Sequence, residues 1–321
     1  MANTFDAFID RTGAETLVPT PISGEIFSGI AQQSAVLSMA RRLPNMTSKM
    51  LKLPVLNSLP SAYFVDGDDG LKQTTSVEWT GKNITAEEIA VIVPVPDAVL
   101  QDSEFDVWAQ IQPLIAQAFG KKIDQAILYG TDKPDSWPDG ILTSAETAQA
   151  TLSATDDGYQ DIMGTGGLID LVEKSGYMVT GYVGAMTSRA YLRGIRAEDG
   201  MPIFRGGMNT ASAYMLDGAP IEFPTNGAVD DTKSLLIAGD WKQLCYAIRQ
   251  DLTVTKSNQA VITDAAGKVI QNFYQQDMTA LRFVMRLGWQ LPNPVGGLGG
   301  STRYPFAVLK PAASALSGGG D

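Results

Sequence analysis

The sequence predicts an α+β protein with two linked domains and an extended β arm. Three observations predict this class. The chain has 321 residues, which is long for a single hydrophobic core. Residues 47–96 have the pattern of strands with little helix, and residues 103–129 then carry apolar side chains at helical spacing. Because 44% of the residues are hydrophobic, a folded protein is expected.

The first segment, residues 1–40, is expected to form an arm followed by a short helix. Pro19 and Pro21 lack a backbone N–H and have a fixed φ, so the arm is neither regular helix nor central strand. Apolar residues recur at helical spacing from Ile26, and Pro44 ends this predicted helix. No basic region precedes an apolar run, so no signal peptide is expected.

Residues 41–102 are predicted to form a long β-hairpin with flanking strands. One strand is predicted at 49–54, and strand patterns return between Val77 and residue 96. The acidic glycine cluster at 66–70 is interpreted as the turn at the hairpin tip, because the other ligands of a calcium loop are not in register. Such a hairpin cannot form its own core, so we expect it to lie on another surface, such as a neighbouring subunit.

Residues 103–142 are predicted to form the longest helix and a loop. Ser103 and Asp106 resemble a capping box, Gly130 ends the helix, and Pro113 is expected to kink it. Polar residues, Asp124 among them, mostly fall off the apolar stripe of this helix. The stripe is interpreted as a packing face, and residues 131–141 are expected to form a loop.

Residues 143–277 are predicted to form a mixed unit of helices and strands. Helices are expected at 168–174 and 188–196, a loop rich in glycine and methionine at 197–213, and strands at 177–183, 221–223, 235–238, 244–248 and 252–254.

The last part, residues 278–311, is predicted to begin with one long strand. Alternation from 278 to 290 places Leu281, Phe283, Met285 and Leu287 on an apolar face and leaves a basic-leaning face that includes Arg282 and Arg286. Residues 312–321 are small and polar, and a flexible tail is expected there.

Composition argues against an enzyme, a metal site and a reader of nucleic acid. The chain has no histidine and one cysteine, Cys245, so the usual general base, His-ligated metals and zinc knuckles are absent. The glycine clusters at 164–167 and 296–300 lack the residues of nucleotide-binding fingerprints, so no cofactor is expected. A formal charge of -11 repels phosphate. No window approaches about eighteen uncharged apolar residues, so no membrane span is expected.

Several short runs, taken in order, resemble the major capsid proteins of tailed double-stranded DNA bacteriophages, which have the Hong Kong 97 type fold. The runs are 79–102, 123–130 (IDQAILYG), 138–142 (PDGIL), 200–203 (GMPI), 216–221 (LDGAPI), 281–289 (LRFVMRLGW) and 304–307 (YPFA). Each run is weak alone, but their order matches that family. The resemblance covers most of the chain.

The resemblance implies an N-terminal arm (1–40), an E-loop hairpin (41–102), a spine helix and loop in the peripheral domain (103–142), an axial domain (143–277) and a return strand of the peripheral domain (278–311). It further implies a shell subunit, not an enzyme, that forms hexamers and pentamers of an icosahedral head. The head would enclose double-stranded DNA without sequence-specific binding. The implied location is the virion, with assembly in the host bacterial cytoplasm.

The resemblance also implies contacts between copies of the chain. Candidate contact residues are Phe64, Lys72, Trp79 and Lys82 in the hairpin and Arg205 in the loop at 197–213. Further partners that the resemblance implies are a portal protein, a decoration protein and either a separate scaffold protein or none, since the arm is expected to start almost at Met1. A Lys–Asn cross-link is not predicted, since no asparagine and catalytic acid can be aligned with Lys72 or Lys82.

Two alternatives stay open on the sequence alone. The first is an encapsulin-like nanocompartment, in which the same fold encloses enzyme cargo. The second is an α/β hydrolase or binding domain, which the absence of histidine disfavours.

Overall fold

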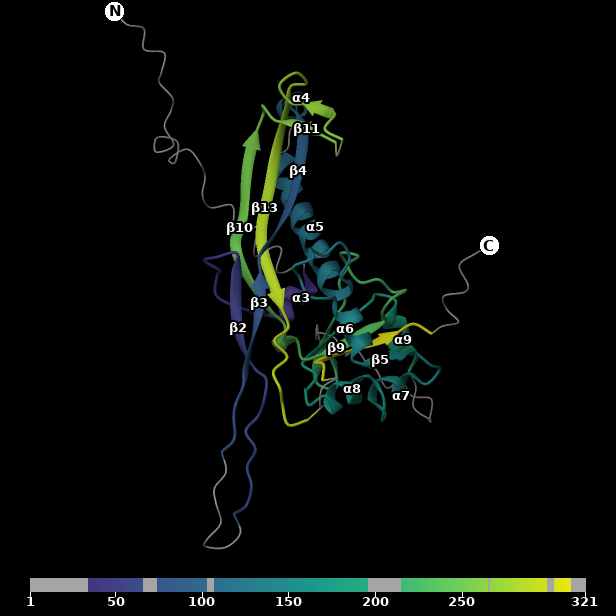
Figure 1. Ribbon diagram of the computed structural model, residues 1–321. Helices are drawn as coiled ribbons and strands as arrows, with labels where there is room; N and C mark the ends of the chain where they lie inside the picture. The colour runs from purple at the N-terminus through teal and green to yellow at the C-terminus, as the bar shows by residue number, and fades with distance from the viewer. Residues whose placement is uncertain are drawn as a thin grey trace, which may run out of the picture.

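The structure is a computed structural model that describes residues 34–65, 74–102, 107–195, 215–264, 266–298 and 303–312 (Figure 1). Its longest strands lie together in one four-stranded sheet. Its strand order is β1-β10-β13-β4, with bounds Arg41–Arg42, Cys245–Ser257, Met278–Gln290 and Glu87–Pro96. β13 is antiparallel to both neighbours, and β1 is parallel to β10. The strand predicted at 278–290 is confirmed with the same bounds.

The two faces of β13 differ as the alternation predicts. The four apolar side chains from Leu281 to Leu287 are buried in one cluster with Phe119 and Ile123 of helix α5 (Val107–Tyr129). On the other face Arg282 is exposed, but Val284 is buried, so the basic character of that face is only partial. The long helix is therefore a packing element of the sheet, as predicted.

Helix α5 ends where the sequence predicts. Gly130 follows it with φ +69°, a left-handed conformation that glycine adopts without steric cost. Pro113 lies inside the helix, and the kink expected there stays a prediction. Residues 103–106, which hold the expected capping box, lie outside the described residues.

A short helix, α4 (Asp97–Asp102), follows β4. The strand patterns predicted up to residue 96 agree with the end of β4, but the helix after them was not predicted. β4 ends at Pro96, and the Asp97 N–H that follows donates to the Asp277 carbonyl at 2.8 Å. The Asp97 side chain then accepts a hydrogen bond of 2.5 Å from the Thr279 hydroxyl, which fixes the turn into the helix.

A second, six-stranded sheet lies beside the long one (Figure 1). Its order is β5-β14-β9-β6-β8-β7, with bounds Thr151–Ser153, Phe306–Lys310, Leu236–Gly239, Gly181–Gly184, Ala219–Glu222 and Met215–Leu216. The helices of this part are α6 (Ile141–Thr147), α7 (Gly158–Met163), α8 (Leu168–Lys174) and α9 (Ser188–Gly194).

Most elements predicted between 143 and 277 exist, with shifted bounds. The helix at 168–174 is confirmed as predicted, and the helix at 188–196 ends two residues early at Gly194. The buried strand expected at 177–183 begins only at Gly181 and ends at Gly184, after a turn at Gly176 with φ +77°. The strands expected at 244–248 and 252–254 are one strand, β10, and its ladder is irregular between Ile248 and Thr253.

Strand pairing divides the chain differently from the expected boundary at 277. β10 pairs with β13 in the long sheet, although it falls within 143–277. β14 falls within 278–311, yet it lies between β5 and β9 in the six-stranded sheet. Long-range pairing of this kind follows from packing and is not visible in local periodicity.

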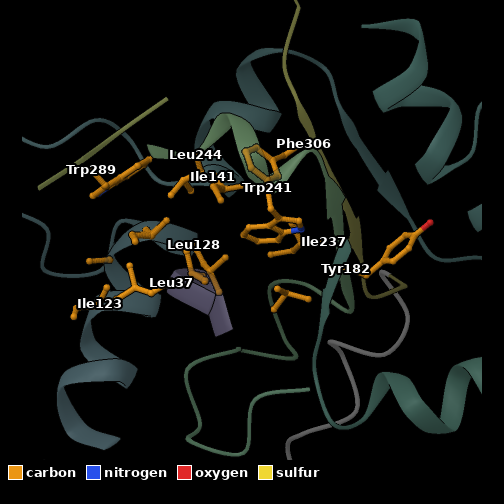
Figure 2. Close-up of a cluster of buried hydrophobic side chains, with 14 of the residues drawn as sticks. Leu37, Ile123, Leu128, Ile141, Tyr182, Ile237, Trp241, Leu244, Trp289 and Phe306 are labelled. Carbon is orange, nitrogen blue, oxygen red and sulfur yellow. The ribbon is translucent and has the colours of Figure 1, made fainter. Parts of the chain in front are cut away.

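One buried cluster connects the two sheets (Figure 2). Trp241, in the short 3-10 helix η1 (Trp241–Gln243), packs edge-on against Phe306 with ring centroids 4.9 Å apart. Its indole N–H donates to the Gly181 carbonyl at 2.9 Å. The same cluster includes Trp289 of β13 and Leu37.

The predicted N-terminal helix is much shorter than expected in its described part. Helix α3 spans Ala35–Met39, and the prediction of helix up to Pro44 is wrong because Arg41–Arg42 pairs with β10 as β1. Residues 1–33, the hairpin tip at 66–70, the loop at 197–213 and residues 313–321 lie outside the described residues. Lys72 and Arg205 lie outside them too.

Two hairpins complete the fold. β2 (Met50–Leu56) pairs antiparallel with β3 (Trp79–Thr85), which confirms the predicted strands on both sides of 66–70. β11 (Val261–Thr263) pairs antiparallel with β12 (Val269–Asn272). In Figure 1 the β2–β3 hairpin extends from one end of the long sheet, and α4 and β11 lie at the other end.

Candidate intersubunit surfaces

The β2–β3 hairpin has almost no core of its own. Only Val55 and Ile84 among its strand residues are buried. Ile84 packs with Met46, Ala86 and Ala247 in a small cluster at the hairpin base. The remaining strand side chains are half-buried or exposed, and among the half-buried ones Leu51 and Leu53 pack against the small cluster. A two-stranded hairpin of this kind is marginally stable in water, so it needs a surface to lie on.

Apolar side chains gather on the segments that continue the hairpin beyond its strands. Asn57 N–H donates to the Glu78 carbonyl at 2.8 Å, so the two segments leave the strands side by side. Phe64 is fully exposed. The other exposed apolar residues of these segments are Leu59, Tyr63, Val65 and Val77. This density of exposed apolar groups is typical of a protein–protein contact.

Trp79 lies at the first position of β3, with 68% of its surface exposed. Its ring lines a cavity of about 310 Å3 between the hairpin and the segment after β13. Proline and aliphatic side chains form most of the other walls, and Arg41 supplies the charge. The structure thus exposes two of the predicted contact residues, Phe64 and Trp79, on the same hairpin.

Lys82, a third predicted contact residue, is used within the chain. Its ammonium group donates to the Leu291 carbonyl at 3.0 Å, and burial lowers its pKa. Val295 N–H donates to the Leu56 carbonyl at 3.0 Å nearby. Both bonds attach the hairpin to the segment after β13, and a role of Lys82 between subunits stays a prediction.

The direction of the hairpin is fixed where β3 passes into β4. A Cβ at Gly288 would overlap the Thr85 carbonyl, so only glycine allows the strands to cross this closely. The same carbonyl accepts a hydrogen bond of 3.1 Å from the Trp137 indole. Ser136 donates to Glu87 at 2.8 Å, and this bond also connects the loop after α5 to the hairpin base. Gly288 was not singled out from the sequence, although an isolated glycine in a long strand signals a close approach.

Asp124 of α5 forms hydrogen bonds to α3 and its N-cap and to the segment between β8 and β9. From the sequence, this residue was expected off the apolar packing face of the helix. It is completely buried on α5. Its carboxylate accepts hydrogen bonds from the Ser34 hydroxyl at 2.5 Å, from Ala35 N–H at 3.1 Å and from Val36 N–H at 3.3 Å. Asn226, in the segment between β8 and β9, also bonds to it. Burial is the main cause that raises the pKa of Asp124 to about 6, and the hydrogen bonds oppose this rise.

A buried cysteine and a small cavity partly lined by charged side chains lie in the described part of the chain. Cys245 is buried, and its sulfur accepts a hydrogen bond from Arg41 at 3.2 Å. A small cavity of about 110 Å3 between β4 and α5 is lined by Glu87, Glu88 and Lys122 among other residues, but Lys122 pairs with Asp132. Within the described ranges no group of three or more histidine, cysteine or acidic side chains could hold a metal ion.

Among the helices that the structure describes, none has the length and apolarity needed to cross a bilayer.

Comparison with known proteins gives one consistent result. Residues 14–296 match the phage capsid family. The chain is 24% identical over 279 residues to the major capsid protein of Staphylococcus phage 80alpha, an alignment that covers 85% of this chain and 80% of that protein. A solved structure from Microbacterium phage Oxtober96 is 33% identical with a TM-score of 0.77, and 95% of this chain and 100% of that chain are covered. One from Mycobacterium phage Adephagia is 29% identical with a TM-score of 0.76, covering 95% and 98%.

Proposed function

This chain belongs to the phage capsid family and is a structural shell subunit of a phage, and we propose that its β2–β3 hairpin is a main contact by which copies of the subunit hold one another. The expected recognition and the Hong Kong 97 type of fold are thereby confirmed. Membership of the phage capsid family argues against the hydrolase alternative. The domain names and contact residues inferred from the resemblance stay predictions.

The exposed apolar surface of the hairpin carries this proposal. Phe64 and Trp79 present large side chains to solvent on an element that has nearly no core. Aromatic residues of this kind dominate the energy of many protein interfaces once a partner buries them. A neighbouring copy supplies such a partner in a shell. We interpret this hairpin as the E-loop that the resemblance implies.

A contact of the proposed kind can close into rings. The hairpin of one copy would lie on a different surface of the next copy, and a contact between two different surfaces closes into rings when the rotation allows it. Hexamers and pentamers are two such closures, and together they form an icosahedral shell. The enclosed double-stranded DNA would meet a wall from a chain with a formal charge of -11, which does not bind phosphate strongly.

The remaining inferences from the resemblance belong to the same proposal. Scaffold, portal and decoration proteins are further partners of such a shell, and the bacterial cytoplasm is the place of its assembly. The virion is the location that the family supports.

Deletion of residues 58–78 tests the role of the hairpin. We replace them with a short Gly-Ser turn after Asn57, at the point where the paired strands end. The expected product is a folded monomer that forms no closed shells, because the buried clusters lie outside the deleted segment. Circular dichroism checks the fold, and negative-stain electron microscopy checks the particles.

The full-length Phe64→Ser variant is a second test, since it keeps the length of the hairpin and removes only one exposed aromatic group. Weakened assembly is expected for it. Normal shells from the deletion variant would overturn the proposed contact.

A further inference from the structure

The junction of α3, α5 and the segment after β8 is built around one buried carboxylate. The Asp124 side chain has no exposed surface, and all of its identified partners donate hydrogen bonds to it. Ser34 connects the set, since its hydroxyl donates to Asp124 and accepts from Leu37 N–H at 3.0 Å. The Asp124 carboxylate of α5 therefore lies at the N-terminal end of α3, against the backbone N–H groups of the first residues of that helix.

Among the described residues, no neighbouring charge balances this carboxylate. Helix α3 carries no charged side chain. On α5 the nearest charged residues along the chain are Lys121 and Lys122, and in the segment that holds Asn226 they are Asp230 and Asp231. Burial and hydrogen bonds, but none of these charges, account for the pKa of Asp124. An ionised group in such a place loses its hydration without gaining an ion pair.

We propose that Asp124 couples the docking of α3 to the uptake of a proton, so that acid strengthens the attachment of the N-terminal part of the chain and a rise towards neutral pH weakens it. When α3 leaves, the carboxyl group meets water and regains its ordinary acidity. The docked state thus holds the proton more tightly than the released state. By linkage, the docking constant is highest below the ordinary pKa of aspartic acid and falls until the pH passes the docked pKa of about 6.

The size of the effect follows from the two pKa values. With values of 3.8 for the released group and about 6 for the docked group, the docking constant falls about tenfold from about pH 5 to about pH 7.5. The change requires no other part of the molecule to titrate. It is a property of the single chain, so it holds whether or not the chain forms shells.

Hydrogen exchange of the full-length chain tests this inference. The readout is the protection of the amides of residues 36–40, among which Ala40 N–H donates to the Val36 carbonyl. Protection is corrected for the intrinsic pH dependence of exchange, and amides of β13 serve as an internal standard. The expected result is an about tenfold loss of protection over that pH range in the natural chain.

Asp124→Asn keeps the shape of the side chain and removes its titration. We expect weaker docking at every pH, because an amide nitrogen cannot accept a hydrogen bond, and a pH dependence no larger than that of the β13 amides. Asp161→Asn is the matched control: Asp161 is also buried, but its carboxylate bonds Thr155 and Tyr191 away from α3. This variant should keep the pH dependence of residues 36–40.

Ser34→Ala provides a second reading if Asp124→Asn does not fold. The Ser34 hydrogen bond lowers the pKa of Asp124, so its loss should move the midpoint of the pH dependence upward. The proposal would be overturned if the natural chain and Asp124→Asn showed equal pH dependence of protection. It would also be overturned if Ser34→Ala left the midpoint of that dependence unchanged or lowered it.

Discussion

Two tryptophans of this chain have opposite roles, which their surroundings define. Trp241 is buried against Phe306, and its indole N–H is bonded to a carbonyl. Trp79 exposes most of its surface at the start of β3. Truncation of Trp241 should therefore act on folding, whereas truncation of Trp79 should act on assembly.

We expect Trp79→Ala to change the free energy of unfolding of the monomer by less than about 0.5 kcal/mol, as for other exposed positions. The concentration at which shells form should rise about tenfold or more, because a buried aromatic contact is lost between copies. Light scattering across a concentration series measures the second effect. Trp241→Ala is the contrast, with a loss of about 3–5 kcal/mol in denaturant unfolding. Unchanged assembly of Trp79→Ala would remove this residue from the contact.

At the scale of single residues, the sequence pointed to two exposed aromatic groups but not to one buried carboxylate. Phe64 and Trp79 were predicted as contact residues, and the structure exposes both, although their contacts remain to be tested. Asp124 was placed off the packing face, yet it is buried. Its partners at Ser34 and Asn226 lie about ninety and one hundred residues away, and local spacing carries no signal for such a site.

Among the elements, the passage from β3 to β4 determines where the hairpin points. Gly288 lies against the Thr85 carbonyl at this passage. The Trp137 indole holds the same carbonyl. A small change at this crossing is carried along the whole hairpin, because the two strands pair continuously from there to Leu56 and Trp79.

Gly288→Ala should force β3 away from β13. We expect a loss of about 1–3 kcal/mol in the free energy of unfolding, as for other insertions into a packed site. Fewer closed shells should form, because the hairpin leaves its direction. Gly297→Ala is the matched control, since a Cβ there meets open space. Equal behaviour of the two variants in denaturant unfolding and electron microscopy would contradict this role of Gly288.

Elements with a strong repeat were predicted well, and weak or long-range elements were not. β13 has one apolar face and one mixed face over thirteen residues, and its bounds were predicted correctly. The helix expected from Ile26 to Pro44 failed after Met39 because β1 gains a ladder with β10 that outweighs helical spacing. Helix α4 was missed since α4 depends on the bond between Thr279 and Asp97, far apart in the chain.

On the scale of the whole molecule, two sheets share one buried cluster (Figure 2). β10, from the part of the chain before residue 277, pairs with β13 in the long sheet. β14, from the end of the chain, lies between β5 and β9 in the six-stranded sheet. This exchange connects the two sheets more closely than the predicted boundary at residue 277 suggested. The α+β class itself was predictable, since the long helix and the long strands are both visible in periodicity.

The central claim is that copies of this chain close into a shell. Analytical ultracentrifugation with negative-stain electron microscopy of the purified chain, over a range of salt and protein concentrations, tests it most directly. The account predicts closed particles of many copies. Packaged nucleic acid in particles from infected cells would separate a phage head from an encapsulin-like compartment with protein cargo. A monodisperse monomer under every condition would contradict the account.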